Sequence, residues 1–270
     1  MLNSFTPARL LVALLLSAQS ALSQAPTPPA QAAAPSPLVA APFASGETLT
    51  YQISWRLFGA GEARMHIESR GADAASSLWQ TTLNVTSGGF VSLLYKVDDT
   101  VVSTFRDGKT SRMCSVSLLK TQNEGRRHRE TRIDFHGDRS TASIRETDLS
   151  KGQVLRQAEE PMPPCAYDIL SALYYVRSLP LEVGRTLELP VNDGGKTLSI
   201  TIEVQAKEEV KTGAGVFRAI RVEPKVFSGS LFKRSGRMQI WFSDDPQRVL
   251  VQLKAKLFFG TVSAVLQQKQ

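Results

Sequence analysis

The chain has few histidines and cysteines, two residue types that often perform catalysis or bind metals. It contains only three histidines, His66, His128 and His136, and none lies in a nucleophile-elbow motif or a His-Glu-x-x-His motif. No histidine or third cysteine is spaced to complete a metal site with the two cysteines. The sequence leaves open a catalytic triad whose residues are far apart in the chain. We expect a protein that is not an enzyme and holds neither a metal ion nor a cofactor.

Long apolar runs are also scarce. The run near the N-terminus, residues 10–16, is far short of the ~20 residues that a membrane span needs. Arg9 is the only charge before Glu47, and Ala21 and Ser23 supply the small residues that a signal peptidase reads. We expect residues 1–23 to be a signal peptide, with cleavage after Ala25 as the alternative. The chain would then be exported, periplasmic and soluble, with no transmembrane segment after cleavage.

Composition divides the rest of the chain into a linker and one domain. Residues 24–42 are rich in Ala and Pro, carry no charge, and predict a disordered linker. Residues 43–270 are long enough for one domain with a sizeable core. The formal net charge of +7 suits an acidic partner surface, although ordinary solubility explains it as well. The sequence leaves the oligomeric state open.

The densest basic run is residues 126–129 together with Arg132. Charge on an edge strand that is exposed to solvent explains such a run, and a surface for anionic lipid or polymer is the alternative. No aromatic residues interleave the arginines as they would on a nucleic-acid platform. We therefore expect no nucleic-acid partner.

Alternating apolar residues predict a mostly β domain. In residues 49–57 every second residue is apolar, and a turn at residues 59–61 leads into a second strand to form a hairpin. Similar runs give about a dozen strands, and the polar runs in residues 111–157 predict a meander with one solvated face. Residues 90–95 fit either a helical turn or a bent strand.

One segment, residues 165–177, predicts a helix. Its apolar residues recur at helical spacing, three prolines precede it, and Pro180 follows it. Asp168 in the first turn and Arg177 in the last turn are placed to interact favourably with the helix dipole. The alternative is that Arg177 binds an anionic headgroup. A lone amphipathic helix must bury its apolar stripe against the sheet. We expect a strongly curved antiparallel sheet, an open or partial barrel, with one main α-helix. The apolar stripe is Ile169, Leu170, Leu173, Val176 and Leu179.

The two cysteines, Cys114 and Cys165, permit one disulfide in an exported protein. The bond would tie a strand to the front of the helix. Two separate buried thiols are the alternative.

Three groups of residues resemble the DUF3108 family. The first is Phe43, Gly46, Glu47, Leu49, Tyr51, Trp55, Gly61 and Ala63; the second is Asp168, residues 171–177 and Gly184; the third is residues 241–245, Arg248 and Gly260. Leu250 departs from the pattern, since members often have proline there. The resemblance spans about residues 43–266. It implies an exported bacterial envelope protein with a curved antiparallel sheet, and it brings no reaction with it.

The expected function is a non-catalytic binding module for a lipid or another apolar envelope ligand. A curved sheet with one helix across it can enclose an apolar groove, although the same side chains also suit a plain core. The alternative is a structural or protein-interaction factor of the cell envelope. Asp244 and Asp245 fit a hairpin turn better than a metal site. Candidate ligand-lining residues are Tyr51, Trp55, Phe58, Phe90, Arg177, Trp241 and Phe258.

Overall fold

A computed structural model describes residues 41–270, except for residues 73–75, 109–112, 226–236 and 258–259. The chain divides into the units Met1–Pro35 and Ser36–Gln270, and all described residues belong to the second unit. The expected signal peptide and all but the last two residues of the expected linker lie outside the described residues, as does Phe258.

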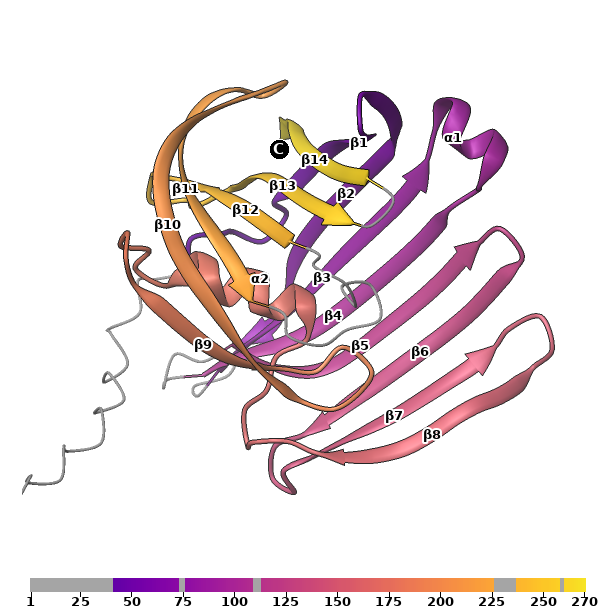
Figure 1. Ribbon diagram of the computed structural model, residues 1–270. Helices are drawn as coiled ribbons and strands as arrows, with labels where there is room; N and C mark the ends of the chain where they lie inside the picture. The colour runs from indigo at the N-terminus through magenta and orange to yellow at the C-terminus, as the bar shows by residue number, and fades with distance from the viewer. Residues whose placement is uncertain (1–40, 73–75, 109–112, 226–236, 258–259) are drawn as a thin grey trace, which may run out of the picture. The chain divides into compact units, whose positions relative to one another are not determined.

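In the described part of the chain, fourteen strands form a single antiparallel sheet, in the order β8-β7-β6-β5-β4-β3-β2-β1-β14-β13-β12-β11-β10-β9 (Figure 1). Nearly all neighbours in this order are consecutive in sequence, and the exception is the pairing of the first strand with the last. The strands are β1 Thr48–Trp55, β2 Phe58–Ala72, β3 Ser76–Ser87, β4 Asp98–Gly108, β5 Met113–Glu124, β6 Arg127–His136, β7 Thr141–Asp148, β8 Gln153–Pro161, β9 Thr186–Val191, β10 Leu198–Thr212, β11 Gly215–Lys225, β12 Arg237–Ser243, β13 Leu250–Leu257 and β14 Gly260–Lys269.

The sheet is curled but does not close into a barrel, because its end strands β8 and β9 do not pair with each other. The fold class expected from the sequence is therefore confirmed. The β9–β10 turn nevertheless reaches across to β5 and β8. Lys120 Nζ donates to Asp193 Oδ1 at 2.9 Å, and Arg156 Nη1 donates to the Gly194 carbonyl at 2.7 Å.

The described residues include two helices, α1 Gly89–Leu94 and α2 Ile169–Ser178. Residues 90–95, which the sequence left undecided, thus fall largely within a short helix. No helix in the described part of the chain has the length and apolarity that a bilayer crossing requires.

Helix α2 begins later than the sequence predicted. Asp168 is its N-cap residue and accepts hydrogen bonds from the backbone of Leu170 and Ser171 at 2.8 and 3.1 Å. Residues 164 and 165 form a bend, and Tyr167 forms an isolated parallel bridge with Val191. The buried stripe also differs from the predicted one, because Ile169 is 42% exposed while Tyr174 and Arg177 are buried.

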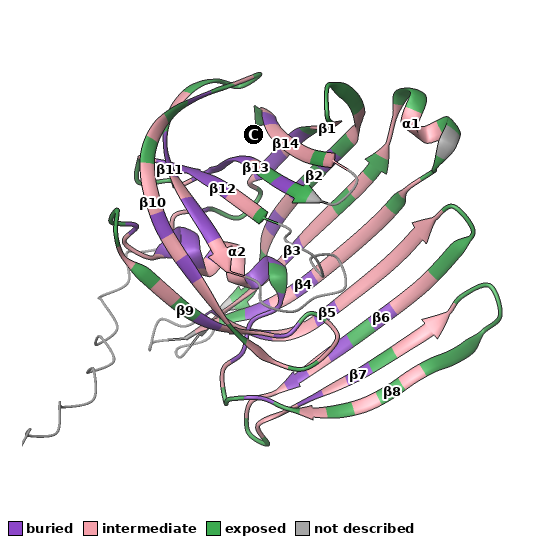
Figure 2. Ribbon diagram, in the orientation of Figure 1, coloured by how far each residue is buried: buried purple, intermediate pink, exposed green. Residues whose placement is uncertain are grey.

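Helix α2 packs on one face of the sheet, which we call the inner face. The Ser103 and Ser115 hydroxyls donate to Asp168 Oδ2 at 2.7 and 2.6 Å, and Thr81 Oγ1 donates to Tyr174 Oη at 3.4 Å. Alternate residues of one strand share a face, and so do directly paired residues of neighbouring strands. The contacts with α2 therefore show which residues of each paired strand lie on the inner face. Buried segments gather on α2 and the strands around it, whereas much of β8 is exposed (Figure 2).

The predicted disulfide is confirmed. Cys114 on β5 and Cys165 before α2 are bonded, with their Cα atoms 5.1 Å apart. The bond fixes the approach to α2 against the sheet.

Two sequence-based expectations are corrected. The β1–β2 turn lies at residues 56–57 rather than 59–61, because Arg56 adopts a left-handed conformation with a φ of 55° and Gly59 and Gly61 are already in β2. The basic run does not form an edge strand either. Its strand β6 pairs with both β5 and β7, so its arginines do not protect a free edge.

Candidate functional site

A buried ion pair joins the end of α2 to the start of the sheet. Arg177 Nη1 and Nη2 donate to the two carboxylate oxygens of Glu47 at 2.7 and 3.0 Å, and Nη2 also donates to the Gln247 carbonyl at 3.1 Å. The guanidinium lies 5.5 Å from the Phe43 ring centroid and 5.2 Å from that of Tyr174. Burial by itself lowers the pKa of Arg177, but the hydrogen bonds and charge of Glu47 outweigh it and raise that pKa above its ordinary value.

This ion pair bears on the expectation that Arg177 lines a ligand site. The Arg177 side chain is 1% exposed and already holds a bidentate partner. The geometry therefore favours a structural role for Arg177 over contact with a ligand.

Two tyrosines pack beside this pair. Tyr51 Oη donates to the Leu250 carbonyl at 2.9 Å. Burial raises the pKa of Tyr51 well above its ordinary value, although the charge of Arg177 opposes the shift. Burial likewise raises the pKa of Tyr174 to about 12, again against the effect of Arg177. These phenols are neutral hydrogen-bonding parts of the core.

A second buried polar cluster surrounds Asp168 at the other end of α2. Its carboxylate accepts four hydrogen bonds, two from the helix backbone and two from Ser103 and Ser115. Burial raises the pKa of Asp168, and these hydrogen bonds oppose the shift. Ser115 also contacts Ser171, with 2.7 Å between the hydroxyl oxygens. The cluster anchors the helix N-terminus to β4 and β5.

The other predicted lining residues are spread over three places. Tyr51 and Trp55 lie on the inner face of β1, with Tyr51 in the core and Trp55 partly exposed. Phe58 and Phe90 lie at one end of the sheet and are 68% and 70% exposed. Trp241 is buried on the opposite face of β12 from Ile240, and its indole donates to Glu208.

The inner face stays apolar beyond the reach of α2. On β1, Leu49 and Tyr51 are buried, but Ile53 and Trp55, further along the same face, are partly exposed. The same decline in burial runs along β14, from the buried Leu266 to the partly exposed Ala264 and Val262. We call the partly exposed set the inner apolar surface: Ile53, Trp55, Leu83, Val85, Val101, Met238, Leu253, Val262 and Ala264.

Strand register makes this surface continuous. Ile53 pairs with Ala264, which pairs with Leu253, which pairs with Ile240. A parallel row runs from Trp55 through Val262 and Ala255 to Met238. Residues that pair directly share a face, so both rows are apolar across four strands, with Ile240 and Ala255 as their buried members.

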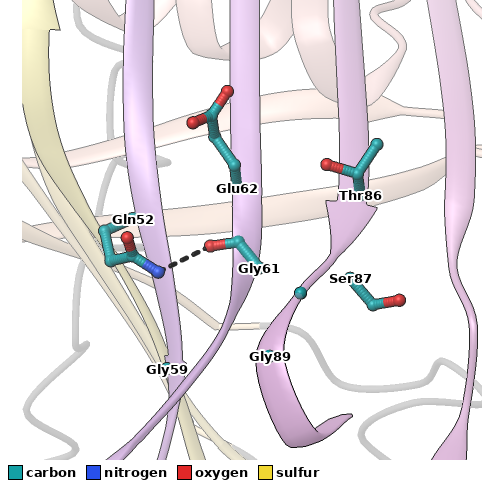
Figure 3. Close-up of a pocket in the computed structure, with 8 residues that line it drawn as sticks. Gln52, Gly59, Gly61, Glu62, Thr86, Ser87 and Gly89 are labelled. Carbon is teal, nitrogen blue, oxygen red and sulfur yellow. Dashed lines mark hydrogen bonds between the residues drawn. The ribbon is translucent and has the colours of Figure 1, made fainter. Parts of the chain in front are cut away.

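A separate hollow of about 370 Å³, lined half by glycines, lies where β1, β2 and β3 approach α1 (Figure 3). Gln52 Nε2 donates to the Gly61 carbonyl there at 2.8 Å. Gly61 has a φ of +156°, and a Cβ atom at this position would lie 2.0 Å from the Thr86 carbonyl oxygen. The close approach of β2 and β3 therefore requires glycine.

The remaining carboxylates have structural partners. Asp245 Oδ1 accepts from the backbone of Gln247 and Arg248 at 2.9 and 3.0 Å, which confirms the predicted turn, and Asp244 pairs with Lys207 at 2.9 Å. The described residues hold no cluster of three or more His, Cys, Asp or Glu side chains that is arranged to bind a metal.

A curled, open antiparallel sheet around one helix defines a β-barrel-like class of protein. A family model, that of the protein of unknown function DUF3108, matches residues 50–267. The chain belongs to this family. A comparison with curated proteins found no match.

Among solved structures, a β-barrel-like DUF1849 protein from Brucella abortus has a similar fold. Its TM-score is 0.51 at 6% identity, and the alignment covers 84% of this chain and 98% of that one. A candidate exported protein with a YmcC-like fold from Bacteroides fragilis gives a TM-score of 0.34 at 10% identity, covering 84% and 96%. A candidate lipoprotein from Parabacteroides distasonis gives 0.34 at 12%, covering 84% and 95%.

The structure gives physical roles to the residues that carry the family resemblance. Glu47 binds Arg177, Asp168 caps α2, Gly61 permits the close strand approach, and Asp245 organises the β12–β13 turn. Sequence reasoning missed the Glu47–Arg177 pair, whose members are 130 residues apart. It also missed the inner apolar surface, because that surface depends on the pairing of β1 with β14.

Proposed function

We propose that the domain is a non-catalytic module of the bacterial envelope that binds a lipid or another apolar ligand on its inner apolar surface. The single observation that carries this proposal is the decline in burial along the inner face. An apolar face that served only as core would be buried along its whole length, whereas here the residues beyond Tyr51 on β1 and beyond Leu266 on β14 are only partly buried.

The width of the surface suits an acyl chain. Two apolar rows cross four adjacent strands, and neighbouring strands lie about 4.8 Å apart, so each row extends over about 14 Å. Burying apolar area on such a surface stabilises a complex by about 25 cal/mol per Å² before the cost of association is subtracted.

Export to the periplasm belongs to the same proposal. The composition of residues 1–23 supports it, and the Cys114–Cys165 bond suits an oxidising compartment. A soluble module in that compartment would shield an apolar ligand from water.

Titration with a fluorescent fatty acid tests the ligand site. We expect the emission of the probe to rise on binding, and the double variant Leu253→Gln/Val262→Gln to bind at least tenfold more weakly, because the amides are polar where the ligand is apolar. Val183→Gln, at an exposed apolar residue outside the surface, is the matched control. Thermal unfolding of each variant checks that the fold is intact. Equal affinities for the wild type and a folded double variant would contradict the proposal.

A further inference from the structure

Exposed apolar side chains gather at one end of the sheet. Four turn segments meet there, residues 55–58, 88–97, 124–128 and 149–152, and we call them together the rim. Figure 1 shows the β1–β2 turn, α1, the β5–β6 turn and the β7–β8 turn in succession along this edge. The exposed fractions are Leu57 96%, Leu93 81%, Phe90 70%, Phe58 68%, Tyr95 49% and Leu149 44%.

Backbone hydrogen bonds make the rim one connected surface. Gly88 N donates to the Ala60 carbonyl at 2.8 Å, which ties α1 to β2 beside the β1–β2 turn. Gly125 N donates to the Lys96 carbonyl at 2.8 Å. Residue 149 in turn donates to the carbonyl of residue 128 at 2.9 Å. The apolar side chains are therefore held on a rigid scaffold rather than scattered.

Positive charge is interleaved with these apolar side chains. The four segments contain five Arg and Lys residues and a single acidic residue, Glu124, and all five basic residues are exposed. The β6–β7 turn at the other end of the sheet, residues 137–140, has no large apolar side chain. The basic residues of the rim are Arg56, Lys96, Arg126, Arg127 and Lys151.

We propose that the rim docks on the surface of a bilayer that contains anionic lipid. Aromatic and leucine side chains at turn tips suit the headgroup boundary, and adjacent cations suit acidic headgroups. A symmetric dimer through the rim would bring the five cations of each copy against those of the other, which disfavours a second copy as the occupant. The proposal does not rest on the ligand site of the inner face.

Vesicle binding tests the docking surface. We expect the protein to bind vesicles of phosphatidylcholine with phosphatidylglycerol at least tenfold more tightly than vesicles of phosphatidylcholine alone, and salt to weaken this binding. Each cation near an anionic surface contributes about fivefold to binding, so Arg126→Glu/Arg127→Glu should weaken it by about thirtyfold or more. The triple variant Leu57→Ser/Phe58→Ser/Phe90→Ser should weaken it by at least tenfold.

Matched controls come from the opposite end of the sheet. Arg139→Glu/Lys211→Glu repeats the charge reversal, and Val216→Ser repeats the loss of an exposed apolar side chain. Both should bind anionic vesicles as the wild type does. A tryptophan introduced by Phe90→Trp should be quenched by brominated lipid, whereas one introduced by Val216→Trp should not. This readout reports on the rim itself, whatever residues 1–40 contribute to binding.

Three results would overturn the proposal. The first is vesicle binding that the rim variants and the control variants reduce equally. The second is an unquenched tryptophan at position 90. The third is a wild-type dimer in lipid-free buffer that the triple variant dissociates, because a second copy would then be the occupant of the rim.

Discussion

Neutralising Glu47 is expected to destabilise the fold strongly. Its carboxylate is 8% exposed and is the bidentate partner of Arg177, which is 1% exposed. Glu47→Gln removes the partner that raises the pKa of Arg177 and leaves the lowering effect of burial, but the ordinary pKa of a guanidinium lies so far above neutral pH that Arg177 stays charged. Removing one partner of a buried pair leaves an uncompensated charge and costs about 3–5 kcal/mol.

Urea denaturation with the disulfide intact measures this loss. A change of this size should lower the Tm by about 10 °C as well. The double variant Glu47→Leu/Arg177→Met should lose much less than Glu47→Gln, because it removes both charges together. Asp134→Asn, which breaks the exposed pair of Asp134 with Arg132 at 2.8 Å, is the matched control and should cost less than about 1 kcal/mol.

The reasoning fails if Glu47→Gln costs no more than Asp134→Asn. It also fails if Glu47→Leu/Arg177→Met is less stable than the wild type by the sum of the losses of Glu47→Leu and Arg177→Met, since additive losses would mean that the two charges do not interact.

Three further predictions concern the fold. Gly61→Ala should cost about 2 kcal/mol in urea denaturation, because its Cβ would clash with the Thr86 carbonyl, whereas Gly59→Ala, with its nearest neighbour 3.8 Å away, should be nearly neutral. Between pH 10 and about 12 the unfolded chain loses the Tyr174 proton while the folded protein keeps it, so this residue should lower stability by about 3 kcal/mol with rising pH. Tyr174→Phe should remove that contribution and leave the one from Tyr51, and an unchanged slope would contradict the reasoning. Cys165→Ser should cost about 4 kcal/mol, and wild-type stability in reducing buffer would argue against a structural disulfide.

Local patterns predicted the elements well. Alternation in residues 49–55 identified β1, and helical spacing around residues 169–176 identified α2. The two cysteines, taken together with the expected export, favoured the bond that the structure has, because each had only one possible partner. These predictions depend on neighbouring residues, which share local geometry.

The failures concern residues whose structure depends on distant parts of the chain. The β1–β2 turn has Arg56 in a left-handed conformation. The prediction relied on the nearby glycines and therefore placed the turn a few residues too late. Alternation shows which residues of a strand share a face but not which strands adjoin, so the pairing of β1 with β14 was not predictable. The inner apolar surface and the ion pair of Glu47 with Arg177 both depend on that arrangement.

The most direct test of the ligand proposal is mass spectrometry of the lipids that are extracted from the purified protein. The protein should be isolated from the cell envelope fraction without detergent, beside the Leu253→Gln/Val262→Gln variant and the Val183→Gln control. We expect a lipid with an acyl chain in stoichiometric amount from the wild type and the control, and much less from the double variant. No bound lipid in any of the three, or equal amounts in all of them, would contradict an apolar ligand site on the inner face.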